Sequence, residues 1–477
     1  MEDFNPSRCE IIKAVISSHK GDQSIDVSAN FIGQFKLQQS MLSVAYSGSC
    51  FVLDTQGILE SFPLRGEEKM DLHIKSFDTQ YVTRLQVRIF KISDIQPANN
   101  SDSVSYTMHF ISDTSFKASL NKVTAPFKTS INRAAREIFN KYFCPIETTP
   151  AFDTERGKIL PFATARFKLS DQSYPKNFFI TPTVGLSKFI VPDLTPSEAM
   201  YFIAARGYNP ETPSQTFRFF ETFNNYYFTT DEFFIKDPEI THDLFFAPDV
   251  PNDPDNQFAA IQRVEELSVL SKGIDSSMDV ASGSYRNDVI EVDLMRRNFS
   301  ISKFNFDDAK YYDMSGDRRD NTSNPHTDKF REDAFTNNNA KKFMVFRNYS
   351  RPGDIPSNLN IDRHLADIAH NRVSYYHHLN NTSLALTLKG RLDINPGDMI
   401  NLDMKALESD DQAKNNNSLS GRYLVQAAVY DVDEASTLTT LLKVVKFDWD
   451  TSAKPVETRD IPAAVIGAAD PNRGGPR

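Results

Sequence analysis

Cysteine is scarce in this 477-residue sequence, and the three cysteines are far apart. Cys9, Cys50 and Cys144 include no Cys-x-x-Cys pair, so the sequence encodes neither a disulfide framework nor a zinc site of the usual spacing. We therefore expect the protein to assemble in a reducing compartment.

Clustered basic residues are missing as well. The formal net charge is −10 and no run of Lys and Arg occurs, which excludes a protein that binds nucleic acid by neutralising phosphates with a basic surface. Acidity would suit a surface past which DNA slides without sticking, but ordinary solubility accounts for the same charge.

Long apolar runs are also absent. No segment approaches the roughly 18 apolar residues that a membrane span requires, and the acidic stretch 1–6 lacks the apolar core of a signal peptide. We expect a soluble protein without an N-terminal export signal. The motifs of the serine-hydrolase elbow, the P-loop, the dinucleotide-binding loop and the calcium-binding loop do not occur.

What the sequence does contain is a repeat. A Pro/Gly turn at 62–67 leads into alternating apolar and polar residues at 70–74, and a turn at 394–398 leads into the same alternation at 400–404. Because two like units in one chain can mimic sixfold symmetry when three chains associate, the repeat points to assembly rather than to catalysis. Each turn is followed by a matching pair of predicted strands, 84–90 with 105–110 and 422–430 with 442–447.

The length predicts two to four domains. Short alternating runs separated by turn residues predict a mainly β protein with helical insertions (α+β), in which two tube-like antiparallel β-barrel domains accompany α/β insertion domains. We expect these parts in the following order: a first barrel at 1–120, an α/β insertion at 121–193, a capped helix and aromatic hairpin belonging to the second barrel at 194–240, a helical insertion and long polar loop at 241–360, the second barrel at 361–450 and a flexible tail at 451–477.

Apolar residues at helical spacing predict helices at 129–142, 258–272 and 361–378. Another helix begins at a capping box, in which Thr195 is the N-cap and Glu198 is the third helical residue. In the first barrel, apolar alternation predicts strands at 11–17, 41–53, 70–77, 84–92 and 104–111.

The predicted helix 361–378 holds the densest group of ionisable residues. A zinc protease helix places two histidines four residues apart, whereas the separations here are six and seven residues. Solvated or capping histidines are therefore favoured, and metal binding stays open. The residues concerned are His364, Asp367, His370, His377 and His378.

Carboxylates could form the pair that a glycosidase needs, either at Asp307 and Asp308 or at Glu408, Asp410 and Asp411. Both groups lie in segments that we predict to be exposed loops, where carboxylates are ordinarily solvated, and the first group suits a helix start. The sequence thus predicts no catalytic, cofactor-binding or metal-binding residues and a protein that is not an enzyme.

Two further segments invite a functional interpretation. Residues 47–50 resemble a nucleophile turn, but no helix follows, so turn residues are favoured. The aromatic hairpin at 219–228 could be a platform for sugars or bases. Alternating Phe and Tyr is more typical of a half-buried strand, and we expect these rings to belong to the core.

The order of these features resembles that of the baseplate hub proteins, or tail-tube initiators, of contractile-tailed bacteriophages. These hubs share their fold with the N-terminal part of VgrG spike proteins. The similar pieces are residues 53–68, the capped helix at 194–206 with its hairpin, and residues 421–425. The resemblance covers residues 5–235 and 361–450.

The resemblance implies a structural protein of the virion and of a contractile injection system, assembled in the host cytoplasm. It implies a homotrimer whose barrels form a pseudo-sixfold ring that joins a threefold central spike to the sixfold tail tube. Tape-measure and baseplate wedge proteins would be neighbours, genomic DNA would pass through the lumen without specific binding, and no cofactor or membrane is implied.

Segments 307–342 and 451–477 depart from the hub pattern. Two alternatives of other classes stay open for the chain as a whole. One is a hub-associated cell-wall hydrolase, and the other is a tail-tip adhesin that binds surface glycans through the aromatic hairpin.

Overall fold

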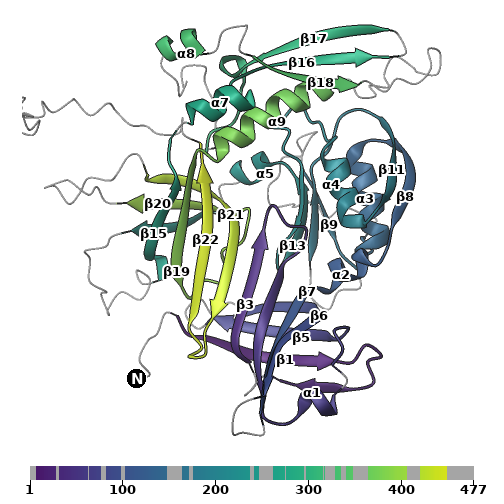
Figure 1. Cartoon of the computed structure of the whole chain (residues 1–477), viewed down its shortest axis with the longest axis vertical. Helices are drawn as coiled ribbons and strands as arrows, with labels where there is room; N and C mark the ends of the chain where they lie inside the picture. Colours follow the sequence, from purple (N-terminus) through teal and green to yellow (C-terminus); the bar gives the residue numbers. More distant parts are fainter. Residues whose placement is uncertain are drawn as a thin grey trace, which may run out of the picture.

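The computed structural model describes most of the chain, and strands predominate in it with helices inserted between them, as predicted. Figure 1 shows one large sheet running through the middle and base of the molecule, with smaller sheets and helices packed at its upper side. The described residues are 7–27, 32–62, 64–76, 82–97, 103–147, 164–170, 176–236, 241–246, 261–273, 275–294, 297–314, 316, 328–334, 340–346, 364–404 and 419–447.

Six strands from the N-terminal part form what we call the first unit. They are neighbours in the order β3-β4-β7-β6-β5-β1, and the short β2 (Ser24–Asp26) lies outside β1. Helices α1 (Ile58–Ser61) and α2 (Asp113–Ser119) follow β4 and β7. The strands are β1 (Cys9–Ser17), β3 (Ile32–Ser40), β4 (Ser47–Asp54), β5 (Lys69–Ser76), β6 (Val82–Pro97) and β7 (Val104–Ser112).

Six later strands form the second unit, in the order β15-β19-β22-β21-β20-β14. If the six strands of each unit are numbered in chain order, both units have the same spatial order, 2-3-6-5-4-1. One pairing differs in direction, because β14 runs parallel to β20 whereas β1 is antiparallel to β5. The strands are β14 (Thr241–Phe246), β15 (Val264–Ser271), β19 (Thr382–Lys389), β20 (Met399–Met404), β21 (Gly421–Val432) and β22 (Leu438–Lys446).

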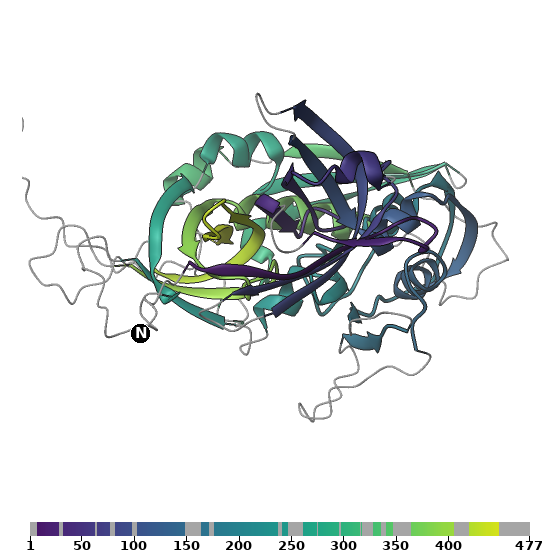
Figure 2. The same ribbon diagram turned by 90° about the horizontal axis from the view of Figure 1, so that it is seen from below.

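The prediction of two separate closed barrels is wrong, because the units share one 13-stranded sheet and no described sheet closes. The reason lies in β21, which pairs with β20 only over its first four residues and then with β3 of the first unit. Seen from below, the yellow-green strands of the second unit curve strongly beside the spread purple and blue strands of the first (Figure 2). A single apolar core contains side chains of both units.

An insertion between the units holds two small sheets and two of the predicted helices. The pair β8-β11 and the four-stranded sheet β12-β13-β10-β9 pack with α3 and α4 around a second core. The bounds are β8 (Val123–Thr129), α3 (Ile131–Tyr142), β9 (Ala165–Lys168), β10 (Asn177–Ile180), β11 (Ser187–Leu194), α4 (Pro196–Ala204), β12 (Arg218–Glu221) and β13 (Asn225–Thr229).

The aromatic hairpin β12–β13 therefore belongs to this insertion and not to the second unit, where the sequence placed it. Its strand β13 runs parallel to β10, and such a pairing between distant segments leaves no local signal. The division of the chain at residues 120, 193, 240 and 360 stays a prediction.

A three-stranded sheet, β17-β16-β18, packs against α9 at the top of Figure 1. A third core joins α9 and α5 to both the hairpin and the second unit. The bounds are α5 (Asp231–Ile235), α7 (Ser276–Ser282), β16 (Arg286–Asp293), β17 (Asn298–Asn305), η2 (Phe306–Asp308), α8 (Asp328–Ala334), β18 (Lys341–Phe346) and α9 (Leu365–Leu379).

Local helix signals were reliable in three of four places. Helices α3 and α9 form where apolar spacing predicted them, and α4 begins at the predicted capping box of Thr195 and Glu198. The helix predicted at 258–272 is wrong, because β15 occupies most of that range. Its apolar residues fit a helix face equally well, but they pair with β19.

Candidate assembly edges of the two units

Glu68 fixes the turn that precedes β5. Its carboxylate oxygens accept hydrogen bonds from the backbone N–H groups of Arg65 (2.7 Å), Gly66 (2.9 Å) and Glu67 (3.0 Å). Its carbonyl accepts a hydrogen bond from the N–H of Ile89 in β6 at 2.9 Å. Gly66 has φ 92°, a conformation that glycine adopts without the steric cost of a Cβ.

Asp398 has the same role before β20. Its carboxylate accepts the N–H of Asn395 at 2.7 Å, and its carbonyl accepts the N–H of Val425 in β21 at 2.9 Å. Gly397 has φ 98° and so matches the glycine of the first turn. Burial raises the pKa of Asp398, and this is opposed chiefly by the hydrogen bond with His242.

Both units also carry a β-bulge at the same point. The pairing of β6 with β7 shifts between Ile89 and Lys91, and that of β21 with β22 shifts between Val425 and Ala427. A bulge bends its strand and increases the local twist. The two units thus share strand order, turn chemistry and the position of the bulge. In the first unit β6 stops pairing with β5 next to its bulge, and in the second unit β21 stops pairing with β20 next to its bulge.

That bend creates the junction between the units. After the bulge, Ala427–Val432 of β21 pair antiparallel with Phe35–Ser40 of β3 (Figure 1). The side-chain amide of Gln39 donates to the Tyr430 hydroxyl at 2.6 Å, and that hydroxyl donates to the Ile394 carbonyl at 2.5 Å. The Gln39 amide N–H and the Tyr430 hydroxyl are thus buried and paired at the junction, whereas the Gln39 side-chain oxygen has no hydrogen-bond partner among the described residues.

The strands equivalent to β21 and β3 are β6 and β15, and each has an edge without a strand partner in the described part of the chain. β5 pairs with β6 only from Val82 to Arg88, so Ile89–Pro97 pair with β7 alone. β15 pairs with β19 on one side, and on the other side a single bridge joins Phe245 to Arg263, just before the strand. The two edges lie on opposite sides of β21 and β3 (Figure 1).

These edges could not be predicted from the sequence, because they depend on which strands become neighbours. Residues 258–272 were interpreted as a helix, and strand β3 was not predicted at all. Alternating apolar residues within β3 were the available signal: Phe35 and Leu37 are 1% and 0% exposed.

The histidines of α9 do not converge on one point. The ring of His364 stacks on Tyr208 with centroids 3.9 Å apart, and His377 Nδ1 lies 3.0 Å from the buried carboxylate of Asp279. The expectation of solvated or capping histidines is wrong for His370 and His378, which are 3% and 0% exposed.

His370 joins α9 to the sheet above it. Its Nδ1 hydrogen-bonds with the Asn287 side chain and its Nε2 with the Ser302 hydroxyl at 3.0 Å. Burial lowers the pKa of His370, while Asp367 and nearby acidic residues oppose this shift. In the described residues, no three His, Cys, Asp or Glu side chains are arranged to hold a metal ion.

The predicted carboxylate pairs fare differently. Asp307 and Asp308 lie in η2, in agreement with the predicted helix start. Asp307 accepts a hydrogen bond from the Tyr285 hydroxyl at 2.9 Å and pairs with Arg331 at 3.1 Å. Glu408, Asp410, Asp411 and the segment 451–477 lie outside the described residues.

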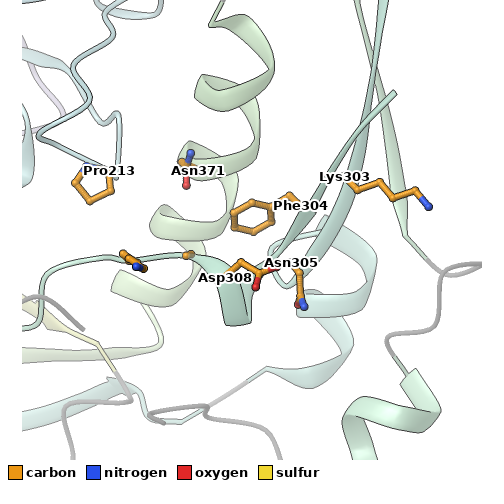
Figure 3. Close-up of a pocket in the computed structure, with 8 residues that line it drawn as sticks. Pro213, Lys303, Phe304, Asn305, Asp308 and Asn371 are labelled. Atoms are coloured by element: carbon orange, nitrogen blue, oxygen red, sulfur yellow. The ribbon is translucent and has the colours of Figure 1, made fainter. Parts of the chain in front are cut away.

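Asp308 borders a pocket of about 330 Å³ between η2, β17 and α9. Figure 3 shows Asn371 on α9 and Phe304 on β17 beside this space, with the Lys303 side chain extending away from it. Asp308 is the one carboxylate among the described lining residues. The described lining of the pocket therefore does not provide the second carboxylate that glycoside hydrolysis requires.

The remaining two segments are structural. Residues 47–50 lie in β4 and not in a turn, and a Cβ on Gly48 would approach the Lys36 carbonyl to 2.3 Å. The hairpin rings are core, as predicted: Phe219, Tyr226 and Phe228 are each 0% exposed. A sugar platform made of these rings is therefore excluded. None of the helices that the structure describes is long and apolar enough to cross a membrane.

Comparison with known proteins gives structural similarity without sequence similarity. No family model and no curated protein matches the chain. A tail protein from Neisseria meningitidis is 10% identical, with 92% of this chain and 99% of that chain covered and a TM-score of 0.46. The 43 kDa tail protein of prophage MuSo2 from Shewanella oneidensis is 8% identical, with 92% and 99% covered and a TM-score of 0.47.

A component of the type VI secretion system of Escherichia coli, described as similar to T4 tail proteins, is 8% identical. The similarity covers 92% of this chain and 77% of that chain, with a TM-score of 0.38. These solved structures are thus two tail proteins and one secretion-system component.

Proposed function

We propose that this protein is a structural subunit of a phage tail baseplate hub, in which three chains form a ring of six similar units. The observation that supports the proposal is that one type of strand-to-strand junction forms only once within the chain. Within the chain, β21 of the second unit pairs with β3 of the first, whereas the equivalent strands β6 and β15 each have an edge that no described strand covers.

An open strand edge is a hazard, because it templates pairing with any other chain. A head-to-tail contact removes the hazard when the subunits form a closed ring. With two units per chain, three chains present six units, and this number matches a sixfold tube on one side and a threefold spike on the other.

The remaining parts of the proposal follow from the sequence resemblance. The hub joins the central spike to the tail tube within the virion, beside tape-measure and baseplate wedge proteins. Genomic DNA passes through its lumen without specific binding, which is compatible with the acidic composition of the chain. The role is structural and not enzymatic.

Size-exclusion chromatography with light scattering tests the proposal. The predicted mass is three times the 54.1 kDa chain. A stable monomer at micromolar concentration contradicts the proposal. A peptidoglycan zymogram with the same preparation tests the hydrolase alternative, and we expect no clearing.

A further inference from the structure

The repeat allows the residues at the open edges of β6 and β15 to be aligned with those of β21 and β3. The turn anchors give the alignment on one side: Val425 and Ile89 donate to the equivalent carbonyls of Asp398 and Glu68, and each immediately precedes its bulge. The residue after that bulge in β21 is Ala427, so its counterpart in β6 is Lys91.

The alignment of β15 with β3 follows through the next two strands. Phe110 pairs with Ile89 and Val444 pairs with Val425, so these two residues are equivalent. Gly48 pairs with Phe110, and Leu384 pairs with Val444. Leu37 of β3 then pairs with Gly48, and Val269 of β15 pairs with Leu384, which makes Leu37 and Val269 equivalent.

When the β21–β3 register is applied to the open edges of β6 and β15, the irregularities of these two strands also match. β6 has an extra bulge between Ser93 and Gln96, and β15 has an extra bulge between Val269 and Ser271. Neither irregularity occurs at the corresponding point of β21 and β3, where the pairing runs without a shift. The two extra residues fall opposite each other, so the transferred pairing again runs one residue to one.

We propose, resting on the hub function above, that β6 of one chain pairs antiparallel with β15 of a second copy of this chain. This interface repeats between chains the β21–β3 junction that each chain forms internally. The pairs are Ser93–Ser271, Asp94–Leu270, Ile95–Val269, Gln96–Ser268 and Pro97–Leu267.

The side chains at this edge fit such a contact. Ile95 and Val269 are 54% and 45% exposed, and the proposed register places them opposite each other. Val269 is equivalent to Leu37, which pairs with Tyr430 of β21 and is 0% exposed in the shared apolar core. Pro97 ends the ladder, where the lack of a backbone N–H costs least.

Cysteine cross-linking tests the register. Gln96 and Ser268 are exposed in the single chain, and cross-strand partners have Cβ atoms about 4.5–5.5 Å apart, close to disulfide geometry. Chains with Gln96→Cys are mixed with chains with Ser268→Cys, oxidised and run on a non-reducing gel. We expect a covalent dimer in the mixture and not with either variant alone.

Glu266→Cys is the matched control, because Glu266 is also exposed and lies two residues from Ser268 on the same face. Diagonal neighbours on paired strands are about 7–8 Å apart, with the Cβ atoms somewhat closer, and this separation is too long for an unstrained disulfide. Little or no dimer with Gln96→Cys supports the proposed register, whereas equal or stronger cross-linking overturns it.

A second pair of variants tests the apolar contact without cross-linking. Val269→Asp should reduce the trimer fraction at least tenfold at micromolar concentration, whereas Leu120→Asp, at an exposed site away from this edge, should leave it unchanged. Trimers that form normally in Val269→Asp, and without cross-linking at Gln96 and Ser268, overturn the interface but leave the hub function standing. A monomeric wild-type chain overturns both.

Discussion

The ion pair between Lys176 and Glu221, where the insertion meets the first unit, allows a sharp test of the cost of leaving a buried carboxylate without its counter-charge. Lys176 Nζ lies 2.7 Å from Glu221 Oε1, with the two side chains 8% and 0% exposed. The hydroxyls of Ser112 and Ser115, beside and within α2, donate to the same carboxylate at 2.8 and 3.1 Å. The Lys176 ammonium also lies over the Tyr46 ring at 4.9 Å.

Replacing Lys176 with Met leaves the Glu221 carboxylate buried without its counter-charge. The two serine hydrogen bonds remain, but they do not neutralise it. Removing one partner of a buried ion pair costs about 3–5 kcal/mol, and we expect the free energy of unfolding to fall by that amount. Lys176→Met combined with Glu221→Gln should recover more than half of the loss, because no charge is then stranded.

Lys117→Met is the matched control. Lys117 Nζ lies 2.8 Å from the Asp113 carboxylate, nearly the same distance, but its side chain is 56% exposed. Asp113 itself is buried, but it keeps Arg88 at 2.7 Å as a counter-charge when Lys117 is removed, so the loss should be only about 0–1 kcal/mol, as for exposed pairs. Urea unfolding followed by near-UV circular dichroism of the buried tyrosines measures both variants. Equal losses for Lys176→Met and Lys117→Met would refute the argument that a buried carboxylate left without a counter-charge sets the cost.

Three further predictions concern a turn, a helix start and a buried histidine. Gly397→Ala should destabilise by more than Gly57→Ala in urea unfolding: both glycines have positive φ, but a Cβ at Gly397 meets an aromatic ring at 2.7 Å and one at Gly57 meets nothing within 4 Å. Thr195→Ala should cost about 1 kcal/mol and Ser130→Ala much less, since only Thr195 makes a side-chain cap hydrogen bond; equal costs would contradict this. Because burial lowers the pKa of His370, this histidine is protonated at a higher pH in the unfolded state than in the folded state, so its contribution to stability should be complete above about pH 6.5 and fall as the pH drops below that value. In His370→Gln, the slope of the unfolding free energy against pH should be smaller, and an unchanged slope would refute the assignment.

Local patterns predicted the parts of the fold that local chemistry determines. The turns before β5 and β20 were visible because glycine, proline and a following alternation are short-range signals. The α4 capping box was visible for the same reason, since Thr195 and Glu198 contact each other within one turn. The core role of the hairpin rings followed from period-two alternation.

Long-range pairing could not be predicted in the same way. β15 has apolar residues that suit either a helix or a strand, and its pairing with β19, more than 100 residues later, decides the outcome. The closed barrels were wrong because β21 leaves β20 for β3, a choice made by strands almost 400 residues apart. The assembly edges exist only relative to such neighbours, and so no motif marks them.

Electron microscopy of the purified protein tests the central claim most directly. The account predicts end-on averages of a closed ring with six similar lobes from three chains, in which contacts within and between chains alternate. Rings of another lobe number, or isolated two-lobed particles at micromolar concentration, would contradict it.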